Sequence, residues 1–253
     1  MARMRRLLPL ALAVLALAAC EGGSTDGASP SPSPSPSASP TAATGSPTPS
    51  PSPSPVTRPI APAWASPIER DLEPEELPEG ALVPPGAILT GRIDLPAAGP
   101  VRDQVAVAYV VGEDPFASEH GLAVWQRFAE APAWSVVYAF ADPPDEGVLG
   151  IRLNSGDLTG DGHDELLVLE ERGGTGACGT WTVVSADAEE TSSIFTRETC
   201  DTEIAIVDGA LEVREAVFEP DDTHCCPSAF RTTTLEWNGE RFARTDVEVE
   251  PTT

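Results

Sequence analysis

After residue 87, the chain consists of short apolar or alternating segments, each bounded by Gly, Pro, Asp or Asn. Segments of this length and pattern are typical of strands, because an amphipathic helix repeats its apolar positions every three or four residues over a longer stretch. We therefore predict an all-β fold, an open stack of short antiparallel sheets that is propeller-blade-like or a sandwich, with little helix outside the N-terminal signal peptide. The predicted strands are Ala87–Leu95, Gln104–Val111, Ala123–Phe128, Trp134–Phe140, Glu165–Leu169, Gly179–Ser185, Ser193–Arg197, Ile204–Val207, Leu211–Phe218 and Arg231–Trp237.

An internal repeat with an offset of 61 residues runs through this region. Asp103–Val107, followed by Leu122–Trp125 and Trp134–Val137, parallels Asp164–Val168, followed by Gly179–Val184. A period of this size, built from three or four strands, is typical of a propeller blade. Propellers close with about four or more blades, and this chain has room for two or three. The repeat therefore favours an open stack or sandwich over a closed ring.

A hairpin is predicted close to the C-terminus. Thr232–Trp237 and Arg241–Val247 flank Asn238-Gly239, and an Asn-Gly pair supplies the positive φ angles of a type I′ turn. The two flanking segments should therefore pair as antiparallel strands.

Residues 57–86 form an acidic, proline-rich lead-in to the β domain of residues 87–253. Within it, Ser66-Pro67-Ile68-Glu69 has the pattern of a capping box with proline at the first helical position. We predict a short helix that begins there and is ended by Pro74 and Pro78.

A tract of Ser-Pro repeats precedes the lead-in. Ala28–Pro55 holds ten of the 27 prolines and no charged residue, and its other residues are Ser, Thr, Ala and one Gly. It therefore lacks the large apolar side chains that a core requires. Proline favours an extended polyproline II conformation, and about 40 residues of this kind reach on the order of 100 Å. We therefore predict a disordered stalk over residues 20–56, either an unmodified spacer or one that carries O-linked glycans.

The N-terminus has the order of a secretory signal. Met1–Arg6 carries three arginines and is followed by the apolar run Leu7–Ala19, which is shorter than the roughly 20 residues of a membrane span. The run ends in Leu17-Ala18-Ala19-Cys20, which resembles the bacterial lipobox. That resemblance implies cleavage of residues 1–19, lipidation of Cys20 and attachment to the extracytoplasmic face of the cell membrane. The alternative is an ordinary secreted protein.

The charge of the chain excludes some partners. The formal net charge is −25, from 15 basic and 40 acidic residues, and residues 1–19 contain three of the basic residues and no acidic one. The mature chain would therefore carry 12 basic against 40 acidic residues. Nucleic-acid binding requires clustered cations, so we predict no nucleic-acid partner.

The segment from Asp157 to Val168 is the most informative motif. Acidic or polar residues alternate in Asp157-Leu158-Thr159-Gly160-Asp161-Gly162-His163-Asp164-Glu165, and an apolar strand follows. This resembles the FG-GAP or VCBS repeat of integrin-like propellers, whose loop binds calcium. The resemblance implies a metal site in loop 157–165 with carboxylate ligands from Asp157, Asp161 and Glu165, Thr159 at the third position and the backbone carbonyl of His163.

Physical chemistry supports calcium in this loop, because calcium takes six to eight oxygen ligands that a tight glycine-bearing loop can supply. Two departures from the family predict weak binding: Thr159 has no carboxylate or amide, and Glu165 is longer than the usual aspartate. An EF-hand does not fit, because its twelfth position would be Val168 instead of a glutamate. The alternative is an acidic turn satisfied by its own backbone amides.

Besides Cys20, the chain has Cys178, Cys200, Cys225 and Cys226. An even number in an oxidising compartment predicts two disulfides. Because adjacent cysteines rarely bridge each other, the favoured pattern joins Cys178 and Cys200 separately to Cys225 and Cys226. A hairpin around Asp187–Glu190 could instead bring Cys178 beside Cys200. The stretch around Cys225 and Cys226 resembles segments of uncharacterised actinobacterial lipoproteins.

Enzyme motifs are missing from the sequence: it contains no Gly-x-Ser-x-Gly elbow, phosphate loop, His-Glu-x-x-His or Ser-x-x-Lys. We therefore predict a non-enzymatic binding or envelope-associated module, attached to the membrane through lipid at Cys20, whose partner is an extracellular protein or glycan. The alternative is an extracytoplasmic hydrolase, for example on glycans. Four tryptophans could line a sugar groove, but their strand patterns favour a core position: Trp125, Trp134, Trp181 and Trp237.

Overall fold

Strands make up most of the described chain. The computed structural model describes residues 62–69, 71–96, 101–114, 116–173, 177–186, 191–223 and 225–252, which all belong to one compact unit. The predicted signal peptide 1–19, Cys20 and the predicted stalk 20–56 lie outside the described residues. Among the described residues no helix is long and apolar enough to cross a membrane.

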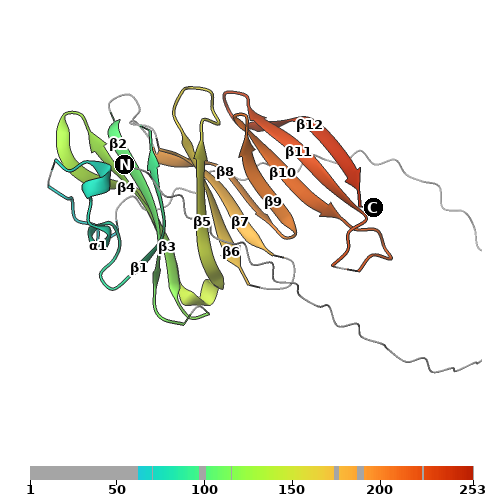
Figure 1. The fold of residues 1–253 in the computed structure, drawn as a ribbon, viewed down its shortest axis with the longest axis horizontal. Helices are drawn as coiled ribbons and strands as arrows, with labels where there is room; N and C mark the ends of the chain where they lie inside the picture. Colours follow the sequence, from blue (N-terminus) through green and yellow to red (C-terminus); the bar gives the residue numbers. More distant parts are fainter. Residues whose placement is uncertain are drawn as a thin grey trace, which may run out of the picture. The chain divides into compact units, whose positions relative to one another are not determined.

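The described part contains twelve strands in three four-stranded antiparallel sheets, and Figure 1 shows these sheets following one another through the unit. Each sheet is a meander in which strands adjacent in sequence pair. The first sheet contains β1 (Ile88–Leu95), β2 (Val101–Val111), β3 (Glu119–Phe128) and β4 (Ala131–Asp142). The middle sheet contains β5 (Val148–Gly156), β6 (Glu165–Arg172), β7 (Gly179–Ala186) and β8 (Thr191–Thr199). The last sheet contains β9 (Thr202–Val207), β10 (Ala210–Val217), β11 (Ala229–Trp237) and β12 (Phe242–Pro251).

The all-β prediction is confirmed, and so is the open stack. The 61-residue repeat corresponds to equivalent strands, because β2 and β6 are the second strands of their sheets and β3 and β7 are the third. A four-stranded meander is the unit from which propeller blades are built. Strand β5 was not predicted from the sequence.

Alternating side chains bury both faces of the middle sheet. On β6, Leu166 and Val168 belong to the apolar cluster shared with the first sheet, whereas Leu167 and Leu169 belong to the cluster shared with the last sheet. All four are less than a tenth exposed. Successive side chains of a strand point to opposite faces, so the uninterrupted apolar run of β6 fills two interfaces at once.

The first sheet is also covered on both faces. Ala106 and Ala108 of β2 pack toward the middle sheet, whereas Val107 and Tyr109 pack against the lead-in. On that side the lead-in contributes its own apolar side chains, which are Trp64, Ala65, Ile68, Leu72, Leu77, Leu82 and Val83. The lead-in therefore acts as an outer layer, and the order of layers is lead-in, first sheet, middle sheet, last sheet.

The lead-in is held by backbone and side-chain hydrogen bonds. Trp134 and Ile68 exchange both backbone bonds, at 3.0 and 3.1 Å. The indole N–H of Trp134 donates to the carbonyl of Leu72, and that of Trp125 donates to the carbonyl of Leu82, both at 3.0 Å. A buried tryptophan usually finds such an acceptor, and here the acceptors fix the path of the lead-in.

The helix predicted to begin at Ser66 is not formed. Ile68 lies in the β-bridge to Trp134, so its backbone is extended where the capping box required a helix. Short helices occur later, a 3-10 turn at Pro74–Glu76 and α1 at Glu79–Leu82. The capping box of the first of these is made by Glu73 and Glu76.

A buried arginine joins the lead-in to the first sheet. Arg127 of β3 has no exposed side-chain surface and pairs with Asp103, with Asp71 at 2.7 Å and with Glu73 at 3.1 Å. Its guanidinium carbon lies 5.3 Å from the ring centre of Trp134. A buried charge is tolerated only when it is paired. The ion pairs with Asp71 and Glu73 therefore hold residues 71–73 of the lead-in against the first sheet.

The C-terminal hairpin is confirmed, but its turn differs from the prediction. Trp237 pairs with Phe242, so the loop has four residues, and of these Gly239 alone has a positive φ, 94°. The Asn238 side-chain oxygen accepts the amides of Glu240 and Arg241 at 3.0 and 2.9 Å. This Asn-centred turn replaces the two-residue type I′ turn.

We predict that Leu167→Ala lowers the free energy of unfolding by about 2 to 5 kcal/mol, because it leaves a cavity in the interface between the middle and last sheets. Val249→Ala on β12 is the control: Val249 is 57% exposed, and its truncation should change stability by less than about 0.5 kcal/mol. Urea unfolding of the full chain carrying Cys20→Ser measures both. Equal effects of the two substitutions would contradict the layered arrangement.

Candidate functional site

Loop 157–165 connects β5 to β6 and turns within nine residues. Gly160 and Gly162 have φ angles of 76° and 87°, in the left-handed region that glycine adopts without strain. A Cβ at either position would meet nothing within 4 Å. Backbone conformation, and not crowding, is therefore the reason for glycine in the Gly-Asp-Gly sequence.

The carboxylates of Asp157 and Asp161 accept hydrogen bonds from the loop itself. The two Asp157 oxygens accept the amides of Gly160 at 2.7 Å and Gly162 at 3.0 Å. One Asp161 oxygen accepts the amide of His163 at 2.9 Å. These are the local turns that aspartate stabilises, and they hold both carboxylates to the loop.

Glu165 has a different environment, because it is only 2% exposed. One of its oxygens accepts the amides of Leu158 at 2.8 Å and Thr159 at 3.1 Å, and the other accepts the Thr159 hydroxyl at 3.3 Å. Burial raises the pKa of Glu165, and the two amides partly oppose this effect. The last residue of the loop therefore closes onto the second and third.

The loop lies where residues of all three sheets meet. Leu158 is buried among apolar residues of the middle and last sheets. A Cβ on Gly209, in the turn between β9 and β10, would lie 3.2 Å from the Asp157 carbonyl oxygen. On the other side, a cavity of about 10 Å³ is lined by Asp161, His163, Asp164, Glu165, Pro96, Gln104, Ser185 and Ala186.

The structure places all five residues of the predicted metal site in this one loop, and it uses their carboxylates as acceptors for backbone amides. Among the described residues, no three His, Cys, Asp or Glu side chains are arranged to hold a metal ion. The donor chemistry still suits calcium, because each carboxylate oxygen has two lone pairs and each Asp157 oxygen accepts one amide. The calcium site stays a prediction.

Sequence reasoning missed Gln104 and Gln126, which form a cross-strand pair between β2 and β3. Both are less than a tenth exposed, and both donate their side-chain N–H to the Ala186 carbonyl, Gln126 at 2.8 Å. They tie the first sheet to the end of β7 beside the loop. The signal was present in the sequence as two polar residues inside apolar strands, and a buried amide needs such a partner.

Three of the four tryptophans have core positions, as their strand patterns predict. Trp125 and Trp134 have no exposed surface, and Trp181 is 8% exposed. Trp237 is half-buried, with its ring centre 5.3 Å from that of Phe242. Three of the four are therefore too deeply buried to line a sugar groove.

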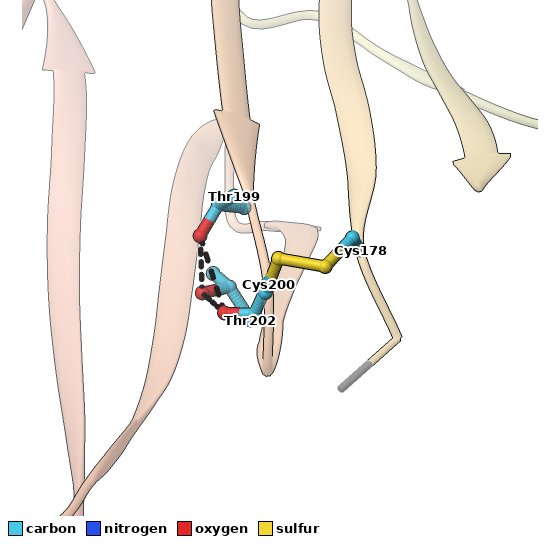
Figure 2. The surroundings of a disulfide bond; sticks show 4 residues. All are labelled: Cys178, Thr199, Cys200 and Thr202. Carbon is cyan, nitrogen blue, oxygen red and sulfur yellow. Dashed lines mark hydrogen bonds between the residues drawn. A yellow bond between two sulfur atoms is a disulfide. The ribbon is translucent and has the colours of Figure 1, made fainter. Parts of the chain in front are cut away.

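Cys178 and Cys200 form a disulfide, which Figure 2 shows at the ends of β7 and β8. The favoured pairing of these two cysteines with Cys225 and Cys226 is wrong. Gly179 of β7 pairs with Thr199 of β8. Cys178, one residue before Gly179, therefore lies opposite Cys200, one residue after Thr199. The hairpin alternative, which rested on a turn near Asp187–Glu190, predicted this pair, although the turn itself lies outside the described residues.

Two threonines order the backbone at Cys200, as Figure 2 also shows. Thr202 donates its hydroxyl to the Cys200 carbonyl at 3.0 Å, and the hydroxyls of Thr199 and Thr202 lie 2.7 Å apart. The disulfide therefore closes the open end of the β7–β8 hairpin next to the start of the last sheet.

Cys225 and Cys226 are both exposed and unpaired with the other two cysteines. They lie in the loop between β10 and β11, where their sulfur atoms are 2.8 Å apart. Instead of the two predicted disulfides, the described residues contain one disulfide and one pair of adjacent thiols.

Comparison with known proteins adds no relative. No protein-family model, no curated protein and no solved structure matches this chain. The functional argument therefore rests on the residues of this chain.

We predict that Cys178→Ser with Cys200→Ser lowers the free energy of unfolding by about 3 kcal/mol, because the bridge closes a loop with a sequence separation of 22 residues. Urea unfolding without reductant measures the change. The matched control is Cys225→Ser with Cys226→Ser, which closes no long loop and should leave stability within about 0.5 kcal/mol of the parent. A reductant should remove the difference between the parent and the first variant, and its failure to do so would contradict the pairing.

Proposed function

We propose that this protein is a lipid-anchored, non-enzymatic binding module on the extracytoplasmic face of the cell membrane, with one weak calcium site in loop 157–165. Its partner is an extracellular protein or glycan. The observation that carries the proposal is the gathering of Asp157, Asp161 and Glu165 on one glycine-bearing loop at the meeting point of three sheets.

The sequence supports the anchor. Leu17-Ala18-Ala19-Cys20 follows a charged and then apolar leader, and the Ser-Pro tract follows Cys20. Two or three acyl chains on one cysteine hold a protein stably, since each buried methylene contributes about 0.8 kcal/mol. The tract would then hold the β unit away from the bilayer, where it can meet a partner.

The loop geometry supports calcium. Asp161 is the most accessible of the three acidic ligands, with a side chain that is 53% exposed, and it lines the small cavity beside the first sheet. Asp157 and Asp161 would supply carboxylate oxygens and His163 its backbone carbonyl. Calcium bound there would fix the loop against its neighbours, because the loop lines a cavity together with Gln104 of the first sheet and its Leu158 packs with apolar residues of the last sheet.

The outer surface supports a binding role. Nearly all of β12 is exposed, including Val247 and Val249, which are 42% and 57% exposed. These two valines lie two residues apart, so their side chains point to the same face of β12, and we infer that this face meets the partner. No observation among the described residues favours the hydrolase.

We predict that Cys20→Ala abolishes incorporation of labelled fatty acid and releases the protein from the membrane fraction. Metabolic labelling followed by fractionation measures both in cells that express the full chain. Cys225→Ala is the control and should retain label and membrane association. A parent chain that takes up no label and is found wholly in the medium would remove the lipid anchor from the proposal.

We predict that calcium raises the melting temperature of the full chain carrying Cys20→Ser and that Asp161→Ala abolishes this rise. At a hundred times Kd, calcium should add about 2.7 kcal/mol of stability. The expected Kd is about 10⁻⁴ to 10⁻³ M, as in other extracellular modules. Calorimetry and thermal unfolding with and without calcium measure the effect.

Asp164→Asn is the matched control, because Asp164 lines the same cavity but is not one of the proposed ligands. It should keep the calcium response. If the parent shows neither heat nor a thermal shift at millimolar calcium, the loop is an acidic turn held by its own amides.

A further inference from the structure

The loop between β10 and β11 presents two adjacent thiols on a fixed base. Cys225 and Cys226 are exposed, and the other two cysteines of the β unit are bonded to each other. The partner available to each sulfur among the described residues is therefore its neighbour in sequence. An exposed thiol pair of this kind is chemically reactive, whereas buried cysteines are inert.

Asp222 closes the base of this loop. Its carboxylate accepts the amide of Glu219 at 2.6 Å and the amide of Ser228 at 2.9 Å, and it also accepts the Ser228 hydroxyl at 2.7 Å. The hydrogen bond donated by the Glu219 amide and those donated by Ser228 lower the pKa of Asp222. The amide of Cys226 donates to the Thr223 carbonyl at 2.9 Å. These bonds fix the turn that carries both sulfurs.

The two sulfur atoms are already close to bonding distance. They lie 2.8 Å apart, and a disulfide bond is about 2.05 Å long. The distance between the sulfurs therefore exceeds the length of the bond by less than about 1 Å. A bridge between adjacent residues is a strained eight-membered ring, and strained exposed disulfides are the ones that are readily reduced.

The two thiols differ in their chemistry. The hydrogen bond between the sulfurs lowers the pKa of Cys225 and raises the pKa of Cys226, and the Thr223 hydroxyl, 3.2 Å from the Cys225 sulfur, adds to the lowering. The thiolate is the attacking species in disulfide exchange. Because the Thr223 hydroxyl lies beside its sulfur, Cys225 is suited to attack first and Cys226 to resolve the product.

We propose that Cys225 and Cys226 form a redox-active dithiol that reacts with low-molecular-weight disulfides and closes to a disulfide between the two adjacent residues. The Cys225 thiolate attacks one sulfur of the external disulfide, forms a mixed disulfide and releases one thiolate. Cys226 loses its proton to solvent, attacks the Cys225 sulfur and displaces the second thiolate. The two cysteines lose two electrons and two protons, and the external disulfide gains them as two thiols. This activity depends on neither the calcium site nor the lipid anchor.

The sequence permits a direct test, because the chain has no lysine and its arginines separate the cysteines. Trypsin cleavage after Arg172, Arg197, Arg214 and Arg231 places Cys178, Cys200 and the Cys225–Cys226 pair in three different peptides. The full chain carrying Cys20→Ser is treated with oxidised glutathione, quenched with acid, alkylated and digested. Mass spectrometry then reads the state of peptide 215–231.

The proposal predicts that peptide 215–231 of the parent becomes lighter by two hydrogens and carries neither alkyl groups nor glutathione. With Cys226→Ser, the same peptide should keep one glutathione on Cys225, because nothing resolves the mixed disulfide. Dithiothreitol should restore two alkylatable thiols in the parent. At one pH, the adduct should form faster with Cys226→Ser than with Cys225→Ser, because the Thr223 hydroxyl lies beside the Cys225 sulfur in the first variant.

Three results would overturn the proposal. They are two alkylatable thiols in the parent after excess oxidised glutathione, a stable glutathione adduct on the parent, or a crosslink from peptide 215–231 to the peptides of Cys178 or Cys200. Faster adduct formation with Cys225→Ser than with Cys226→Ser would overturn the assignment of Cys225 as the attacking thiol. The intact Cys178–Cys200 bridge in each variant controls for folding.

Discussion

Burial of the middle sheet on both faces is the constraint on which the rest of the structure depends. A four-stranded meander has two faces, and an isolated sheet of this size leaves both in water. In β6, Leu166 and Val168 fill one interface while Leu167 and Leu169 fill the other. The first and last sheets are therefore required as covers, and the first sheet in turn requires the lead-in over Trp125 and Trp134.

The two proposed sites lie in loops that connect strands, and the packed sheets provide the rigid scaffold that positions these loops. Loop 157–165 enters the middle sheet between β5 and β6, and Leu158 anchors it in the core. The Cys225–Cys226 turn extends from the last sheet, whose strand β12 is exposed along nearly its whole length. The proposed calcium site is thus coupled to the packing of the sheets, whereas the proposed dithiol has only local support from Asp222.

Much of the fold could be predicted because uninterrupted apolar runs such as Leu166–Leu169 determine strands buried on both faces. β5 was missed for a local reason: the register shifts between Val148 and Gly150, so Val148 and Ile151 both reach the same cluster and the alternation is broken. The observed disulfide was only the second choice, because the sequence could not show that Gly179 lies opposite Thr199 in the β7–β8 pair. The helix at Ser66 was wrong because Ile68 pairs with the distant Trp134, and such a pairing leaves no local signal. The acidic loop was found, and its internal hydrogen bonds match the alternative of an acidic turn satisfied by its own backbone amides.

Native-state hydrogen exchange of the full chain carrying Cys20→Ser tests the layered account most directly. The account predicts that amides of β2, β3, β6 and β7 exchange only when the whole unit unfolds, whereas those of β12 exchange through local opening with a smaller free energy. Denaturant dependence separates the two routes, because global unfolding exposes more surface. Amides of β12 as strongly protected as those of β6, or amides of β6 that exchange by local opening, would contradict it.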